Sequence, residues 1–275
     1  MDIFFTKMQG GGNDFVIIDN RTQIEVLKYG KEAAKHLCHR KFGIGADGLI
    51  LIEDPKQPHA HTHFSWRFYN ADGSEAEMCG NGARCAARFA YLTQIAPSKM
   101  KFETLAGIIE AEVFPHSNQV KIRLSDAKGL KTGLIVSIQG QLHTVHFIDT
   151  GVPHAVLFVS DLKNAPVVEW GRFLRYHEMF QPKGTNVNLV QVLSPSEIAI
   201  RTYERGVEDE TLACGTGATA SAIISAVTGH CSPPVQVRTQ GGDVLTIDFI
   251  LKDETAREVF LTGPAVVVFE GKIRL

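Results

Sequence analysis

The sequence predicts a mixed α/β protein made of two related domains, each containing a helix that begins at a cysteine. Two observations lead to this prediction. The motif Cys-Gly-x-Gly-Ala occurs at Cys79 and again at Cys214, 135 positions later in a chain of 275 residues. The same offset also pairs residues outside the motif, namely Phe68 with Tyr203, Glu75 with Glu210, Thr104 with Thr239 and Gly107 with Gly242. Self-similarity at one fixed offset over so much of the chain indicates an internal duplication.

Each cysteine motif is typical of a turn that leads into a helix. Small and apolar residues follow it as far as Leu92 in the first copy and Val227 in the second. A helix N-terminus presents unpaired backbone N–H groups and a partial positive charge, which favour a thiolate and attract anions. Glycines allow a ligand to approach those N–H groups. A buried, inert cysteine is the alternative for one copy alone, and the repetition favours the reactive interpretation.

Composition and charge point to a protein that acts on a small molecule. The chain is 44% hydrophobic and 21% charged, and 28 Lys and Arg against 30 Asp and Glu give a formal charge of −2. This balance does not indicate binding to nucleic acid or to an anionic membrane. The N-terminal segment lacks the basic and apolar pattern of a signal peptide, and no apolar run approaches the roughly 18 residues of a membrane span. We therefore expect a cytoplasmic protein, with five free cysteines: Cys38, Cys79, Cys85, Cys214 and Cys231.

The first half of the chain predicts one domain of strands and helices. Besides the helix that follows Cys79, the pattern favours a helix at 31–40 and strands at 3–8, 15–19, 49–52, 64–68, 101–104, 108–113 and 119–124. The loop at Gly10–Gly12 is not a P-loop, because no Gly-Lys-Ser/Thr follows it. Residues 43–48 match G-x-G-x-x-G, but a helix precedes them and a strand follows. That order is the reverse of a dinucleotide-binding unit and argues against a dinucleotide cofactor.

Three histidines, His59, His61 and His63, alternate in a short segment before a predicted strand. If extended, they would share one face and could form a metal site. No cysteine or carboxylate supplies an evident further ligand, so a solvated loop is the favoured interpretation and no metal is expected.

The second half repeats the order of elements. A turn at 150–154 and helices at 169–179 and after Cys214 accompany strands at 134–138, 145–149, 155–159, 186–192, 198–203, 235–238, 244–250, 259–261 and 266–269. We place the two domains at 1–128, with Cys79, and 129–275, with Cys214. Because each would contribute one thiol, we expect the active site in a cleft between them.

Two thiols in one site suit few reactions. One group can remove a proton from a carbon while the other delivers a proton to the opposite face, which inverts the centre. The carbanion-like transition state would be stabilised by preorganised backbone donors. This scheme requires no pyridoxal phosphate or other cofactor. A cysteine-nucleophile amidohydrolase and a redox-sensing binding protein remain as alternatives from other classes.

The motifs resemble those of the diaminopimelate epimerase family. The resemblance lies in Gly12–Phe15, Phe68–Ser74, Met78–Arg84, Pro153–His154, Tyr203–Gly206 and Ala213–Gly217. It implies two pseudo-symmetric domains, each a β-barrel-like sheet around a central helix. It also implies a cofactor-independent isomerase that interconverts LL- and meso-diaminopimelate, for lysine and peptidoglycan synthesis, and a homodimer.

The resemblance also assigns roles to individual residues. Cys79 and Cys214 would be the acid and base, and His154 and Glu204 would tune their pKa values. The implied substrate contacts are Asn13, Asn70, Gly80, Asn81, Asn186, Glu204, Arg205, Gly215 and Thr216. Gly48 stands where some members carry Gln, and Val152 stands where many carry Asn, which leaves the substrate range open. A related racemase that acts on glutamate or proline is therefore the alternative within this fold.

Overall fold

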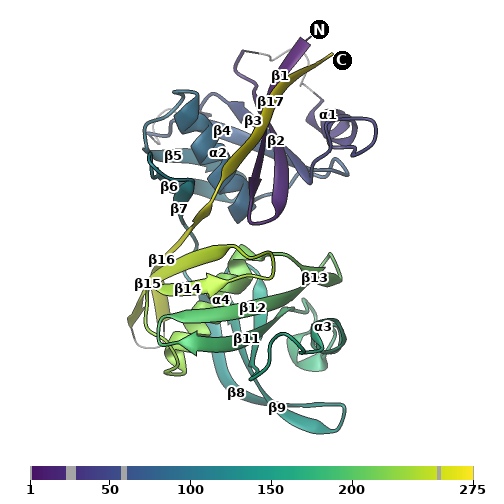
Figure 1. The fold of residues 1–275 in the computed structure, drawn as a ribbon, viewed down its shortest axis with the longest axis vertical. Helices are drawn as coiled ribbons and strands as arrows, with labels where there is room; N and C mark the ends of the chain where they lie inside the picture. The colour runs from purple at the N-terminus through teal and green to yellow at the C-terminus, as the bar shows by residue number, and fades with distance from the viewer. Residues whose placement is uncertain (1, 23–28, 57–60, 253–254, 275) are drawn as a thin grey trace. The chain divides into compact units, whose positions relative to one another are not determined.

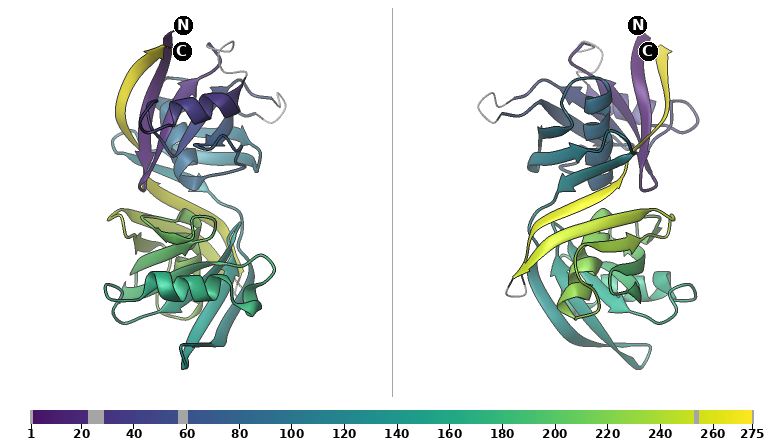
Figure 2. Two further views of the ribbon diagram at one scale, coloured as in Figure 1. Left: turned by 90° about the vertical axis from the view of Figure 1, so that its right-hand side faces the viewer. Right: turned by 60° about the vertical axis from the view of Figure 1, so that its left-hand side comes forward.

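The computed structural model describes residues 2–22, 29–56, 61–252 and 255–274. The chain forms two compact units, one of Met1–Ile122 with Gly263–Leu275 and one of Arg123–Thr262. The expected division at 128/129 treated each domain as one continuous stretch. The structure differs because the C-terminal strand returns to the first unit, where it pairs with the N-terminal strand from Asp2↔Arg274 to Gln9↔Val266. Figures 1 and 2 show these two strands side by side.

Unit 1 has a sheet with the order β17-β1-β2-β3-β4-β5-β6-β7. The β2–β3 and β4–β5 pairs are parallel and the others are antiparallel. The strands are β1 (Asp2–Gly10), β2 (Asn13–Asp19), β3 (Gly48–Glu53), β4 (Phe64–Asn70), β5 (Lys99–Thr104), β6 (Gly107–Val113), β7 (Gln119–Arg123) and β17 (Val266–Arg274).

Unit 2 has the order β8-β9-β10-β11-β12-β14-β15-β16, with β13 also paired to β12. The β10–β11 and β12–β14 pairs are parallel, so parallel and antiparallel pairs follow the same succession as in unit 1. The strands are β8 (Lys128–Ile138), β9 (Gln141–Asp149), β10 (Pro153–Phe158), β11 (Asn186–Ser194), β12 (Glu197–Glu204), β13 (Asp209–Thr211), β14 (Val235–Arg238), β15 (Val244–Lys252) and β16 (Thr255–Pro264). The mixed α/β fold class predicted from the sequence is confirmed.

Each sheet packs around one buried helix. In unit 1 this is α2 (Gly80–Leu92), which contacts β1, β2, β3 and β6, and in unit 2 it is α4 (Gly215–Val227), which contacts β9 to β12, β14 and β15. Alanines supply much of the buried surface of both helices. Such small side chains let a helix lie close to strands on several sides.

A second helix covers the other side of part of each sheet. Helix α1 (Gly30–Leu37) packs on β3 and β4, and α3 (Val167–Arg175) packs on β11, β12 and β13. A 3₁₀ turn follows α3 at Glu178–Phe180. No helix within the residues that the structure describes has the length and apolar character needed to cross a bilayer.

Local differences from the predicted elements have local causes. The helix predicted at 31–40 ends at Leu37, because the loop folds back so closely that a Cβ on Gly43 would overlap the carbonyl oxygen of His36. The turn predicted at 150–154 ends two residues early, since Pro153 already begins β10 and His154 pairs with Asn186. The short strand β13 was not predicted.

Candidate active site

Cys79 is the N-cap residue of α2. Its backbone is extended, with φ −143° and ψ 120°, and its half-buried Sγ accepts a hydrogen bond from Gly82 N at 3.4 Å. The sulfur therefore occupies the position that a capping oxygen takes at other helix N-termini. An ionised thiol at this position would be stabilised by the first-turn N–H groups and by the helix dipole.

Cys214 holds the equivalent place in unit 2, as the N-cap residue of α4 with φ −128° and ψ 109°. This thiol is buried, and its Sγ lies 3.5 Å from Thr216 Oγ1. The carbonyl of Thr216 accepts a hydrogen bond from Thr150 Oγ1 at 3.0 Å, which ties the first turn of α4 to the end of β9. The two motif cysteines thus share a backbone setting and differ in their polar neighbours.

The two glycines of each motif serve different purposes. A Cβ on Gly82 would lie 3.3 Å from Ile50 Cδ1, and a Cβ on Gly217 would overlap Asn188 Oδ1, so the second glycine lets each helix start lie close to a strand. By contrast, a Cβ on Gly80 would meet only Ile122 Cδ1, at 3.8 Å. Packing therefore does not explain the glycine at position 80.

The other three cysteines lie in settings that keep a thiol protonated. Burial raises the pKa of Cys38 to about 12, with the charge of Lys7 opposing, and burial raises the pKa of Cys85 to about 12. Burial also raises the pKa of Cys231. These three residues are unsuited to proton transfer near neutral pH.

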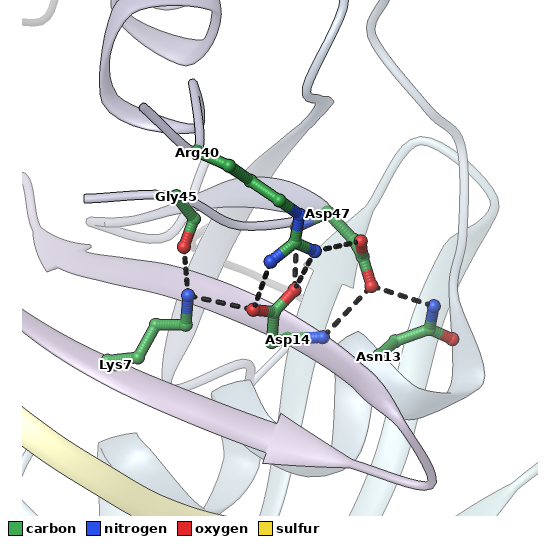
Figure 3. Close-up of polar contacts among 6 residues, drawn as sticks. All are labelled: Lys7, Asn13, Asp14, Arg40, Gly45 and Asp47. Atoms are coloured by element: carbon green, nitrogen blue, oxygen red, sulfur yellow. Dashed lines mark hydrogen bonds and ion pairs between the residues drawn. The ribbon is translucent and has the colours of Figure 1, made fainter. Parts of the chain in front are cut away.

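Asn13 lies at the edge of a cluster of ion pairs (Figure 3). Its Nδ2 donates to Asp47 Oδ2 at 3.1 Å, and Asp47 is held in turn by Arg40 at 2.7 Å. Arg40 and the buried Lys7 both pair with Asp14, at 2.9 and 2.8 Å. Burial would raise the pKa of Asp14, but hydrogen bonds from Arg40 and Lys7 outweigh it and lower this pKa to about 2. A rigid network of charges therefore supports the side chain of Asn13.

Asn13 also connects to the start of α2. Asn81 Nδ2 donates to Asn13 Oδ1 at 2.7 Å, and Asn81 Oδ1 accepts from Arg84 Nη2 at 2.9 Å. The carboxylate of Asp47 can only accept hydrogen bonds, and the guanidinium of Arg84 can only donate them. The amides of Asn13 and Asn81, which lie between these two groups, therefore each have one possible orientation. Each amide keeps one N–H outside this chain of bonds.

The glycine-rich loop before Asn13 has a structural explanation. Gly11 and Gly12 both have positive φ, 66° and 89°, and form the turn of the β1–β2 hairpin. A Cβ on Gly11 would approach Asn81 Oδ1 at 3.4 Å and Arg84 Nη2 at 3.5 Å. The turn thus packs against the first turn of α2, and glycine meets both the conformational and the steric requirement.

Asn70 and Gly48 lie near this group through the register of the sheet. Gly48 pairs with Phe15 on one side and with Asn70 on the other. Asn70 is exposed at the end of β4, where its Nδ2 donates to Ser74 Oγ at 3.0 Å. A Cβ on Gly48 would lie 2.5 Å from Phe68 Cε2, so the Phe68 ring occupies the space that a longer side chain would need.

In unit 2, three neighbouring strands bring the predicted polar residues together. His154 on β10 pairs with Asn186 on β11, and the register of β11 with β12 places Glu204 next to Asn186. Asn186 Oδ1 accepts from the backbone N of Arg205 at 2.7 Å, and Arg205 Nη1 donates to Lys183 O at 2.9 Å. Asn186, Glu204 and Arg205, which lie 32, 50 and 51 positions after His154, thus meet it at one end of one sheet.

Two titratable groups of this cluster are shifted towards their neutral forms. Burial, with a smaller contribution from the charge of Arg205, lowers the pKa of His154 to about 3. Burial raises the pKa of Glu204, against a hydrogen bond from Thr211 Oγ1 at 3.0 Å. His154 is therefore a neutral imidazole at pH 7.

Sequence reasoning missed four polar residues that support these groups: Asp47, Arg84, Asn188 and Thr202. Asn188 and Thr202 are buried within the sheet of unit 2, and Arg84 is buried within α2. The sequence signal that could have found them is a polar residue inside an otherwise apolar element, because a buried polar group needs a hydrogen-bond partner.

Of the histidine cluster, His59 lies outside the described residues, and His63 Nδ1 contacts Lys101 O at 3.3 Å. No group of potential metal ligands forms within the described ranges.

Comparisons with known proteins define the class and then the family. A phenazine biosynthesis protein of the PhzF family from Bacillus anthracis shares the fold with a TM-score of 0.75, at 13% identity and with 100% of both chains covered. A probable proline racemase from Agrobacterium radiobacter K84 shares it with a TM-score of 0.70, at 13% identity, over 99% of this chain and 93% of the other. The fold is thus one that a protein described as a probable proline racemase also adopts.

The family model described as diaminopimelate epimerase matches residues 5–129 and 146–268. A diaminopimelate epimerase of Aquifex aeolicus (strain VF5) is 50% identical over 277 residues, covering 98% of this chain and 97% of that protein. The chain belongs to the diaminopimelate epimerase family, and it is an isomerase.

Proposed function

We propose that this protein interconverts LL- and meso-diaminopimelate by removing and returning the proton on the α-carbon, without a cofactor. The observation that carries the proposal is the pair of cysteines at equivalent helix N-caps, within a chain that belongs to this family. The product is a precursor for lysine and peptidoglycan synthesis.

In the proposed reaction, the thiolate of one motif cysteine removes the α-proton and the thiol of the other delivers a proton to the opposite face. The roles reverse in the opposite direction. The electron pair left on the carbon delocalises into the substrate carboxylate, so negative charge develops on the carboxylate oxygens. Backbone N–H groups at Gly80–Asn81 and Gly215–Thr216 would stabilise that charge, because the first turn of each helix has N–H groups without intrahelical acceptors.

The remaining polar residues would bind the ends of the substrate. Asn13 and Asn81 each keep one N–H beyond the chain of bonds between Asp47 and Arg84. Asn70, Asn186, Glu204 and Arg205 complete the proposed set, and His154 and Glu204 tune the pKa values of the thiols. Some relatives carry Gln at the position of Gly48. Because Phe68 fills the space beside Gly48, no side chain at this position binds the substrate in this protein.

Proton exchange in D2O tests the two-base mechanism. Each thiolate reaches the α-hydrogen of one stereoisomer, so Cys79→Ala should exchange the α-hydrogen of one isomer only and Cys214→Ala that of the other only. Neither variant should form epimerised product at an appreciable rate. Cys231→Ala is the matched control, because this thiol is buried outside both motifs, and it should retain inversion.

A single-base enzyme gives another pattern, in which one variant is inactive towards both isomers and the other still inverts the centre. Inversion that survives replacement of either motif cysteine would therefore refute the mechanism. Hydrolysis of an amide substrate without α-proton exchange would instead select the cysteine-nucleophile alternative.

The proposal includes a cytoplasmic location and a homodimer. The free thiols support the first, because such thiols persist in a reducing compartment. The second rests on the family resemblance. Light scattering of the purified protein measures the oligomeric state, and a monomer that is fully active would contradict the dimer.

A further inference from the structure

The equivalent helix N-termini of the two units have different side chains beneath them. In unit 1 the strands under α2 contribute Phe15 and Ile50, and a Cβ on Gly82 would lie 3.6 Å from Phe15 Cε1 and 3.3 Å from Ile50 Cδ1. Both of these side chains are apolar, so neither can form a hydrogen bond.

In unit 2 the corresponding strand positions hold His154 and Asn188. The correspondence follows from the register, since Phe15 pairs in parallel with Gly48, two residues before Ile50, and His154 pairs in parallel with Asn186, two residues before Asn188. A Cβ on Gly217 would overlap Asn188 Oδ1 and lie 3.3 Å from Cys214 Sγ. A buried polar pair thus replaces an apolar pair under the helix that begins at Cys214.

The amide of Asn188 is held in one orientation. Its Nδ2 donates to Ala155 O at 3.1 Å, and its Oδ1 accepts from Thr202 Oγ1 at 2.9 Å. Reversing the amide would bring two oxygens together at Ala155, in a site with no exposure to solvent. The Nδ2 group must therefore face Ala155.

This orientation determines which imidazole nitrogen of His154 carries the hydrogen. The second hydrogen on Asn188 Nδ2 points to His154 Nδ1 at 3.1 Å, so Nδ1 is the acceptor. A neutral imidazole has one N–H, and it must then be on Nε2. Nε2 is fully buried and has no hydrogen-bond partner within the described part of the chain. A buried donor without an acceptor is costly unless a ligand supplies one.

We propose that Asn188 is a positioning residue that fixes His154 as the Nε2–H tautomer, so that this N–H is free to donate to a carboxylate of the bound substrate. The ligand's identity rests on the proposed function, whereas the tautomer does not. A carboxylate suits the site because His154 Nε2–H is a donor and Arg205 adds positive charge to the surroundings of the ring.

Nitrogen-15 NMR of protein labelled at histidine tests the tautomer directly. At pH 7 the His154 signals, assigned by their loss in His154→Gln, should show an unprotonated Nδ1 and a protonated Nε2. Addition of meso-diaminopimelate should shift the Nε2–H signal. A protonated Nδ1 in the unmodified protein, or an Nε2–H signal that saturating ligand leaves unchanged, would overturn the proposal.

Two substitutions probe the role of Asn188. In Asn188→Asp the carboxylate cannot donate, so the hydrogen should move to Nδ1 and kcat/KM should fall about 10- to 100-fold, mainly through KM. In Asn188→Ile, which copies Ile50 of unit 1, Nδ1 loses its donor and the single tautomer should be lost. An unprotonated Nδ1 that persists in either folded variant would refute the role of Asn188.

Thr202→Val is the matched control. It removes a contact to the same amide but leaves both Nδ2 bonds, so the His154 tautomer should not change. A changed tautomer in this variant would count against the proposal. The two proposals fail separately: absence of epimerisation in the unmodified protein would refute the proposed function, whereas a protonated Nδ1 in an active enzyme would refute only this inference.

Discussion

Replacing Gly80 by alanine should separate the stability of the protein from its activity. Gly80 is the first residue of α2, and its φ is not positive, so alanine can adopt the same backbone conformation. The new Cβ would contact only Ile122 Cδ1, at an ordinary distance of 3.8 Å. A change from glycine to alanine at such a position stabilises the fold by about 0.4–1 kcal/mol, because the unfolded chain loses conformational freedom.

The effect on catalysis should have the opposite sign. The added methyl group would stand beside the N–H groups that we propose for the substrate carboxylate. Loss of one preorganised donor to a developing negative charge typically lowers kcat by about 10²- to 10³-fold. We therefore expect Gly80→Ala to be at least as stable as the unmodified protein and to have lost most of its epimerase activity.

Urea unfolding and initial rates of epimerisation measure the two effects on the same preparation. Gly215→Ala is the matched variant in unit 2, where the Cβ would lie 3.2 Å from Cδ1 of the buried Leu261, so its gain in stability should be smaller. Unchanged kcat/KM in Gly80→Ala would show that the glycine does not serve ligand access. A loss of more than about 1 kcal/mol of stability would show that the packing argument is wrong.

Three further predictions concern the supporting residues. Asp47→Asn should release the amide of Asn13 from its single orientation. KM should then rise by up to about tenfold, the equivalent of one hydrogen bond, and an unchanged KM would contradict the role of Asp47. Gly217→Ala should lower the free energy of unfolding by about 1–3 kcal/mol, because the Cβ would overlap the buried Asn188 Oδ1, and a neutral result in urea unfolding would count against this packing. Burial lowers the pKa of His154 in the folded state to about 3, from an ordinary value of about 6.5, so the unfolded chain binds the proton first and stability should fall as pH drops from about 6.5 towards 3. His154→Gln should reduce the change in the free energy of unfolding with pH by up to about 1.4 kcal/mol per pH unit. If this change between pH 5 and pH 7 is equal in the variant and in the unmodified protein, the assignment is refuted.

The sequence by itself determined the duplicated motif and indicated its two cysteines as the candidate reactive groups. The Cys-Gly-x-Gly-Ala motif is a local pattern, and a helix N-cap is a local structure, so Cys79 and Cys214 could be located without any tertiary contact. Most strands followed from the alternation of apolar residues for the same reason. The resemblance at Pro153–His154 predicted a role for His154 in the site, although the predicted turn was two residues too long.

Only the tertiary structure decided which residues support these groups. The last strand, β17, completes the first unit because it pairs with β1, and no feature near residues 266–274 specifies that distant partner. Asn188 contacts His154, 34 positions away, only because β10 and β11 lie side by side in parallel. The sequence shows that a buried amide needs partners, but its partners, and therefore the tautomer of the histidine, depend on strand register. Register is a property of the assembled sheet, in which one backbone geometry must satisfy every buried polar group at once.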